Sequence, residues 1–305
     1  MTLKAIPVDV REALEAGVTS ASLALASGCP RHELAGRLYA TWYAAPIAPS
    51  DAPPDLPDDL VAVLRAAHAG SERWEDGWVA EQAGRAGRVV ARRREERRLL
   101  ERSEYVVPDR PGIIASPGAA LLAVARRDHV DPDAGWWYAH TPGWRLDGSE
   151  PALVRLFWNV GAGEAATLVA ALSSYLTSVE APSLLKCAID PDAYSRADAV
   201  VLYLTRESVD VLRDGLDEVY ALASPVLRDG APPLTLRVGR GLAASDDPGA
   251  DESFGEHRCR LVAEGVLRAE SPDQAADAVL ERFREEGVPP DRPYLADEGR
   301  RLPWE

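Results

Sequence analysis

The sequence predicts an α+β protein with N-terminal helices, a β-rich middle, and a C-terminal split β-α-β-β-α-β sheet with helices on one face. Two observations support this class. The second half alternates short apolar runs with longer amphipathic stretches. The second and third runs are separated by only about ten residues, too few for the crossover helix that parallel strands require. These strands are therefore expected to be antiparallel neighbours.

The N-terminal half is expected to change from helix to strand near Trp74. Residues 8–45 show helical periodicity, residues 45–57 form a Pro-rich linker, and Asp58 or Asp59 caps a helix over residues 58–69. The short strands expected after Trp74 are a hairpin at 78–91, a charged hairpin or edge strand at 92–98, and segments at 112–114, 121–124 and 135–139.

The C-terminal half contains the split unit. Its strands are expected at 154–160, 184–189, 199–204 and 234–238, and its helices at 163–179 and 205–222. A loop at 240–253 and helices at 254–267 and 272–286 follow. We expect residues 1–70 to form a helical region, and residues 71–305 to form an α+β domain that either stands alone or shares one compact domain with it.

Composition excludes several classes of partner. A net charge of −15 argues against a nucleic-acid or anionic membrane surface, so neither partner is expected. The sequence has no apolar run near 18 residues and no apolar core of a signal peptide, which indicates a cytoplasmic protein. Three widely spaced cysteines, Cys29, Cys187 and Cys259, are typical of reduced thiols.

Lys186 is unusual for this chain. Lysine and arginine total 34, yet only Lys4 and Lys186 are lysines, and Lys186 lies in an apolar run from Ser183 to Ile189. A buried lysine can lose its proton near neutral pH, which arginine cannot do. The alternative is a lysine without function that remains by chance in a lysine-poor sequence, with its aliphatic stem packed and its amine in water. The position alone leaves both readings open.

Two other motifs are weaker. Gly161 and Gly163 fit a loose dinucleotide-binding pattern, but Glu164 would repel a pyrophosphate and the following strands lack a crossover helix, so a tight turn is favoured. His257 and Cys259 have no second pair at metal-ligand spacing, so no metal is expected. The arginines beside them form either an anion site at a helix start or a solvated basic end.

Four segments carry a resemblance to a known family: residues 38–43, 154–160, 194–203 and 252–261. In the spacing and type of their residues they resemble the HopA1-type proteins. These proteins are relatives of bacterial phosphothreonine lyases, and in actinobacteria they accompany peptide biosynthesis. The resemblance covers most of residues 31–268. It implies β-elimination of phosphate from phospho-Ser or phospho-Thr, without water, metal or any other cofactor.

The resemblance also implies site residues. Lys186 matches the base that takes the Cα proton, Arg196 and Tyr203 match residues that bind phosphate and assist, and Arg258 matches a late phosphate-binding arginine. Such a base must be neutral, which burial and nearby arginines favour. Arginines suit the departing phosphate because they bind it bidentately.

One position departs from the family pattern. The family's acid is a histidine on the strand before the helix, where this chain has Asn159. The proton then comes from His257, from Tyr203 or from an arginine-polarised phosphate oxygen, or activity is lost. Arg155 and Arg260 complete the candidate phosphate-binding set.

The expected substrate is a precursor peptide with a leader, phosphorylated by a separate Ser/Thr peptide kinase. Its products would be dehydroalanine or dehydrobutyrine, as in class V lanthipeptide or thioamitide biosynthesis. A rival from another class is a non-catalytic peptide-binding subunit that partners a kinase or cyclase. A nucleotide-dependent enzyme that uses Gly161 and Gly163 is the third alternative.

Overall fold

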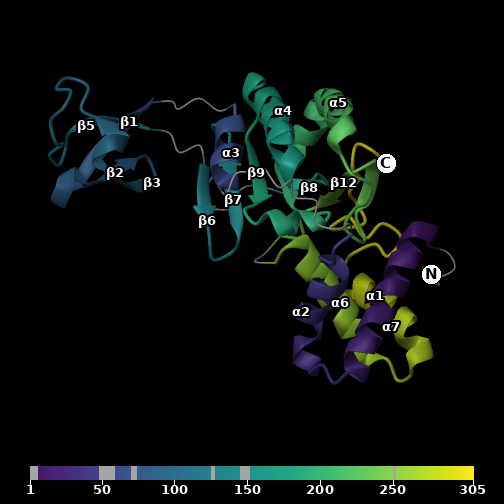
Figure 1. Ribbon diagram of the computed structural model, residues 1–305. Coiled ribbons are helices and arrows are strands. Elements are labelled where there is room, and N and C mark those ends of the chain that lie inside the picture. Colours follow the sequence, from purple (N-terminus) through teal and green to yellow (C-terminus); the bar gives the residue numbers. More distant parts are fainter. Residues whose placement is uncertain (1–5, 48–58, 70–73, 125–127, 145–151, 250–251) are drawn as a thin grey trace. The chain divides into compact units, whose positions relative to one another are not determined.

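The computed structural model describes residues 6–47, 59–69, 74–124, 128–144, 152–249 and 252–305 (Figure 1). The chain divides into a large unit, Met1–Ala69 with Val130–Glu305, and a small unit, Gly70–His129. One antiparallel sheet has seven strands and the other has five. The α+β class is therefore confirmed. Most of the expected Pro-rich linker lies outside the described residues.

The seven-stranded sheet contains the split unit. Its spatial order is β11-β12-β8-β10-β9-β7-β6. The strands are β6 (Asp128–Asp131), β7 (Trp136–His140), β8 (Leu153–Trp158), β9 (Ser183–Ala188), β10 (Val200–Thr205), β11 (Leu236–Gly239) and β12 (Leu242–Asp246). The antiparallel pairing of β9 with β10 confirms the inference from their short connection.

One segment of the large unit that was expected to be a loop is a strand. Residues 240–253 were expected as a loop, but Leu242–Asp246 forms β12, which pairs with β8 in the sheet interior. All five β12 residues are buried. Small side chains at Ala243 and Ala244 fit this crowded position, and pairing with β8, rather than local propensity, decides the structure.

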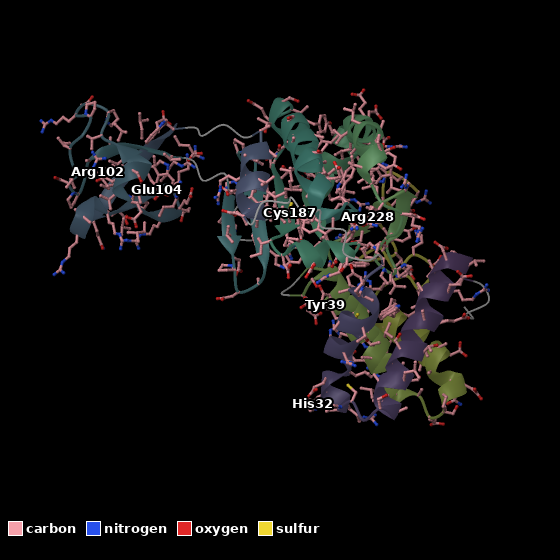
Figure 2. The ribbon with its side chains drawn as sticks, in the orientation of Figure 1. His32, Tyr39, Arg102, Glu104, Cys187 and Arg228 are labelled. Atoms are coloured by element: carbon pink, nitrogen blue, oxygen red, sulfur yellow. The ribbon has the colours of Figure 1, made fainter. Side chains whose placement is uncertain are left out.

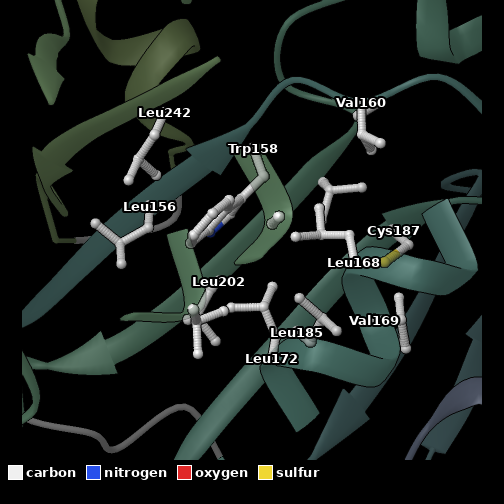
Figure 3. Close-up of a cluster of buried hydrophobic side chains, with 14 of the residues drawn as sticks. Leu156, Trp158, Val160, Leu168, Val169, Leu172, Leu185, Cys187, Leu202 and Leu242 are labelled. Carbon is white, nitrogen blue, oxygen red and sulfur yellow. The ribbon is translucent and has the colours of Figure 1, made fainter. Parts of the chain in front are cut away.

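Helices cover one face of this sheet, here called the α4 face. The helices are α3 (Leu60–Ala67), α4 (Ala165–Ser178) and α5 (Arg206–Ala223). Alternate strand residues such as Leu156, Trp158 and Leu202 pack with Leu168 and Leu172 of α4 (Figure 3). The start of α3 is fixed by Asp59, whose side chain accepts a hydrogen bond from the Ala62 amide. Both helices of the split unit thus cover one face, as predicted.

The opposite face, here called the α6 face, meets a second helical layer. This layer contains α1 (Val8–Ala26), α2 (Leu34–Leu38), the π-helical turn η3 (Tyr39–Tyr43), α6 (Phe254–Arg268) and α7 (Ala275–Glu285) (Figure 1). Phe157, Val201 and Ala243 of the sheet share a core with Phe254 of α6. The α6 face of the sheet also carries polar side chains from neighbouring strands.

The small unit is a five-stranded sheet in the order β3-β2-β1-β5-β4. Its strands are β1 (Trp74–Ala83), β2 (Val89–Arg93), β3 (Glu96–Leu100), β4 (Tyr105–Val106) and β5 (Ala120–Val124). The charged run forms the β2–β3 hairpin, with β3 at the edge, as predicted. The strand expected at residues 112–114 is wrong: the segment is a turn and loop in which Ile113 and Ile114 are exposed.

None of the described helices is long and apolar enough to cross a membrane.

Candidate active site

Strand register brings four polar side chains to the α6 face. Lys186 on β9 pairs with Tyr138 on β7 and with Val201 on β10. Two residues further along β10, Tyr203 pairs with Arg155 on β8. Directly paired residues, and every second residue of a strand, project to the same face of a sheet. Lys186, Tyr138, Tyr203 and Arg155 therefore lie on one face, across four adjacent strands.

Lys186 combines burial with an aromatic neighbour. Its Nζ lies 3.9 Å from the centroid of the Trp136 ring and 5.9 Å from that of Tyr138. Burial, followed by the positive charge of Arg155, lowers the pKa of Lys186 to about 8. Within the part of the chain that the structure describes, no carboxylate forms an ion pair with this amine. About a tenth of the amine is therefore neutral at pH 7, far more than for a solvated lysine.

Arg155 presents part of its guanidinium beside Tyr203. Its Nε and Nη2 donate to one carboxylate oxygen of Asp247, at 2.7 and 2.6 Å, and its side chain is 10% exposed. The guanidinium carbon lies 5.1 Å from the Tyr203 ring centroid. Burial raises the pKa of Tyr203, so its phenol keeps its proton at neutral pH. The side of Arg155 that bears Nη1 is turned away from this ion pair.

Arg196 is held just before β10. Its Nε and Nη2 donate to the two oxygens of Asp198, at 2.8 and 2.7 Å, in a bidentate pair. Its Nη2 also donates to the Tyr39 hydroxyl, at 3.2 Å, which connects the sheet to the helical layer. Figure 2 labels Tyr39 in that layer. The positive charge of Arg196 also helps to lower the pKa of Lys186. Asp198 thus fixes the direction of a cation beside Lys186.

His257, a candidate for the acid, makes its contacts elsewhere, and so does Asn159, which stands at the position of the family's acid. Asn159 is 1% exposed, and its Nδ2 donates to the backbone carbonyl of Asp229 at 2.8 Å. His257 bonds to Arg258 through Nδ1, and its Nε2 lies 3.4 Å from Glu286. Burial and the charge of Arg258 lower the pKa of His257 to about 4. His257 is therefore neutral at pH 7 and poorly suited to donate a proton.

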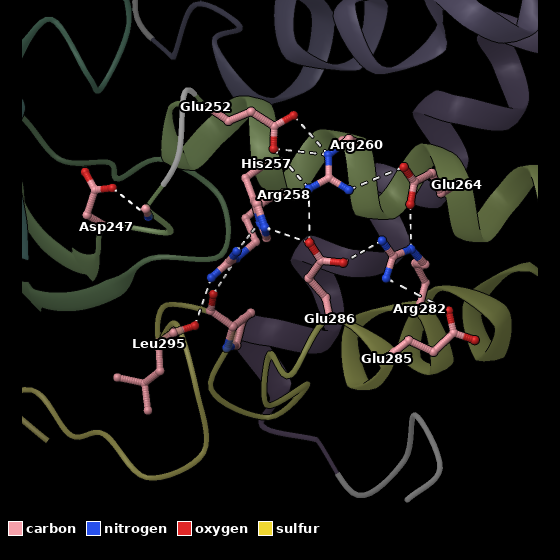
Figure 4. A network of polar contacts seen from close by, with 12 residues as sticks. Asp247, Glu252, His257, Arg258, Arg260, Glu264, Arg282, Glu285, Glu286 and Leu295 are labelled. Carbon is pink, nitrogen blue, oxygen red and sulfur yellow. Dashed lines mark hydrogen bonds and ion pairs between the residues drawn. The ribbon is translucent and has the colours of Figure 1, made fainter. Parts of the chain in front are cut away.

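The two late arginines belong to a polar network on α6 (Figure 4). Arg258 is fully buried, and it donates from Nε to the Pro293 carbonyl and from Nη2 to the Leu295 carbonyl. Burial lowers its pKa to about 9. Arg260 bonds to three carboxylates: Glu252, Glu264 and Glu286. Both arginines therefore form their hydrogen bonds with residues other than those around Lys186.

Comparison with known proteins identifies the family. A model of the HopA1 effector protein family matches residues 138–295, just over half of the chain. The chain belongs to the HopA1 effector protein family. The matched residues include Lys186, Arg155, Arg196 and Tyr203. No curated protein matches the chain.

Two solved structures share the fold of this HopA1 family member. An effector protein from Pseudomonas syringae pv. tomato strain DC3000 is 16% identical, with a TM-score of 0.58, and the match covers 95% of this chain and 100% of that one. An effector protein from Pseudomonas syringae pv. syringae strain 61 is 16% identical, with a TM-score of 0.57, covering 96% and 100% of the two chains. At this identity the likeness shows the fold.

Several neighbours of Lys186 in this HopA1 fold escaped the sequence reasoning. Trp136 and Tyr138 were not predicted as site residues, although their alternation with buried Trp137 could have indicated a second face. Asp247 is 92 residues from Arg155, and no local signal links them. A cavity of about 300 Å³ nearby is lined by Ala35, Gly36, Tyr39, Glu252, Glu256 and Arg260. Among the described residues, no group of three or more His, Cys, Asp or Glu side chains could hold a metal.

Proposed function

We propose that this protein is a phospho-Ser/phospho-Thr lyase that removes phosphate from a precursor peptide by β-elimination. The observation that carries the proposal is the Lys186 amine. It has no carboxylate partner among the described residues, its pKa is lowered to about 8, and it shares a sheet face with Arg155 and Tyr203. A neutral amine beside phosphate-binding cations is what β-elimination requires.

Lys186 takes the first step. Its neutral Nζ accepts the Cα proton of the phosphorylated residue, and the electrons of the C–H bond form the Cα=Cβ double bond. The bond between Cβ and the bridging oxygen breaks, and phosphate leaves with the electron pair of this Cβ–O bond. The peptide product is dehydroalanine from phosphoserine or dehydrobutyrine from phosphothreonine. Lys186 ends the step as an ammonium and then returns its proton to solvent.

Arg155, Arg196 and Tyr203 serve the leaving group. Each arginine is oriented by an aspartate on one side of its guanidinium, which leaves N–H groups on the other side for phosphate oxygens. Tyr203 is protonated at neutral pH and stacks under Arg155, so its phenol can donate to the bridging oxygen. We assign Tyr203 the acid role in preference to His257, whose contacts lie elsewhere.

The substrate class follows from the resemblance to peptide-modifying lyases. A separate kinase would phosphorylate Ser or Thr of a leader-bearing precursor in the cytoplasm, and this lyase would complete the dehydration. The dehydrated residues would then be available for thioether ring formation, as in lanthipeptide or thioamitide biosynthesis. No metal or organic cofactor is needed for this chemistry.

The test uses a phosphothreonine peptide that carries its leader, with mass spectrometry to detect loss of phosphoric acid. We expect wild type to convert the peptide and both Lys186→Ala and Lys186→Arg to be inactive. The arginine variant is the matched control because it keeps the positive charge but cannot deprotonate at the assay pH. An active Lys186→Arg variant would show that Lys186 is not the base.

A non-catalytic peptide-binding subunit is the second candidate. Two observations favour it: Arg155 and Arg196 are already neutralised by aspartates, and Asn159 stands where the lyases have their acid. Fluorescence titration with the same phosphopeptide separates the two functions. Saturable binding without conversion by the wild-type protein supports the subunit, whereas turnover supports the lyase.

A further inference from the structure

The Lys186 amine rests on an aromatic surface of β7. Trp136 pairs with Ala188 and Tyr138 pairs with Lys186, so both rings stand on the lysine's side of the sheet. The Trp136 centroid is 3.9 Å from Nζ and the Tyr138 centroid is 5.9 Å away. Cation–π attraction acts within about 6 Å, and it is strongest over tryptophan. Trp136 is therefore well placed to interact with the ammonium form of Lys186.

The other charges around Lys186 act in both directions. Arg155 and Arg196 disfavour its ammonium, but Asp247 and Asp198 are bound to them. Glu256 favours the ammonium from the first turn of α6, where its carboxylate also accepts a hydrogen bond from the Ser253 amide. Among the described residues, none of these carboxylates forms an ion pair with Nζ. The Trp136 ring is thus the near neighbour that can distinguish ammonium from amine.

We propose that Trp136 is the positioning residue of Lys186: its ring fixes the amine above the sheet and stabilises the positive charge that appears when the amine accepts a proton. The inference rests on the proposed role of Lys186 as base. A carbon acid is a weak acid, so stabilising the protonated product of the transfer strengthens the base. Burial lowers the pKa of Lys186 and so makes the neutral amine accessible, whereas the ring partly offsets burial by stabilising the ammonium.

The scarcity of lysine allows a direct test without substrate. Protein grown with lysine carrying ¹³C at Cε gives only two lysine signals, from Lys4 and Lys186. The Lys186→Arg variant identifies which signal belongs to Lys186. Titration followed by NMR then gives the pKa of Lys186, with Lys4 as the internal standard.

The decisive variant is Trp136→Leu, which removes the ring but keeps apolar bulk. We expect the pKa of Lys186 to fall by about one unit, because the ammonium loses its cation–π contact. Trp136→Phe should lower the pKa of Lys186 less, because phenylalanine keeps part of the cation–π attraction. Trp74→Leu in the small unit is the matched control and should leave the pKa of Lys186 unchanged. An unchanged or raised pKa in folded Trp136→Leu protein would overturn the proposal.

Misfolding cannot imitate this result. An unfolded chain would expose Lys186 and raise its pKa toward the value of a solvated lysine, opposite to the expected change. If Trp136→Leu does not fold, Trp136→Phe decides by the direction of its smaller shift. The outcome is also separate from the lyase assay: a lowered pKa without peptide conversion would retain the positioning role and reject the proposed reaction.

Discussion

Lys186 lowers the free energy of unfolding of this protein. Its pKa falls from the ordinary 10.5 to about 8 because burial and Arg155 disfavour the ammonium in the folded chain. A group that binds its proton less tightly when folded opposes folding at every pH where the unfolded chain is protonated. At about 1.4 kcal/mol per pKa unit, this opposition reaches at most about 3 kcal/mol.

Replacing Lys186 with methionine should therefore stabilise the protein while abolishing activity. The gain is full below pH 8, where the lysine is protonated in both states, and it fades as pH rises toward 10.5. We expect a gain of about 1–3 kcal/mol in the free energy of unfolding at pH 7. Denaturant unfolding at pH 7 and pH 10 measures it. A destabilised variant at pH 7 would argue that the amine supports the fold.

Removal of the Tyr203 hydroxyl tests the assigned acid. Tyr203→Phe keeps the ring beneath Arg155 but cannot donate a proton to the bridging oxygen. We expect the rate of phosphate elimination to fall by about 10²–10⁴, with little change in phosphopeptide affinity. Tyr175→Phe is the matched control, since the Tyr175 hydroxyl bonds to the Leu212 carbonyl between α4 and α5. A wild-type rate in Tyr203→Phe would return the acid role to a phosphate oxygen.

At the scale of elements, Arg258 joins α6 to the C-terminal segment. Its guanidinium satisfies the buried carbonyls of Pro293 and Leu295, so Arg258→Met would leave both without a donor. We expect a loss of about 2–6 kcal/mol, because each of the two unsatisfied carbonyls costs about 1–3 kcal/mol. Denaturant unfolding measures the loss, and faster amide exchange at Leu295 would locate it.

The control for Arg258 is its helix neighbour Arg260. Its carboxylate partners are partly exposed, so Arg260→Met should cost only about 1 kcal/mol. Equal losses in the two variants would contradict a structural role specific to Arg258. If Arg258→Met instead weakened phosphopeptide binding without changing stability, Arg258 would be a phosphate ligand, as the family resemblance implies.

Elements with strong local signals were predictable, and those determined by distant contacts were not. The starts of α3 and α5 lie at Asp59 and Thr205, whose side chains accept capping hydrogen bonds from the Ala62 and Ser208 amides. Strand β12 was missed because Leu242–Asp246 changes from apolar to polar residues and follows Gly241. It becomes a strand because it pairs with β8, more than 80 residues earlier.

At the scale of the whole molecule, the candidate site was likewise predictable from local signals but not from contacts between distant residues. The short connection between β9 and β10 predicted that Lys186 and Tyr203 lie on neighbouring strands. The aspartate that orients Arg155 could not be predicted, because the sheet brings Asp247 to it only in the folded chain. Residue type and the family resemblance thus pointed to Lys186 as the candidate base, whereas the aspartates that orient the arginines depend on tertiary structure.

The division of the chain into two units gives a final prediction. Trp136, Lys186 and every other residue of the candidate site belong to the large unit, whereas the small unit has its own core around Trp78 and Tyr105. Replacing residues 74–124 with a flexible glycine-serine linker should therefore preserve the site, since a flexible loop closes at a modest entropic cost.

The same lysine titration measures the outcome of this replacement. We expect the pKa of Lys186 to stay near its value in the full chain, because each charge that shifts it, from Arg155 to Glu256, lies in the large unit. Elimination from a short phosphothreonine peptide should also persist. If the shortened protein folds but Lys186 titrates like a solvated lysine, the small unit must contribute to the environment of the site. Conversion of short peptides but not of leader-bearing peptides would instead assign leader recognition to the small unit.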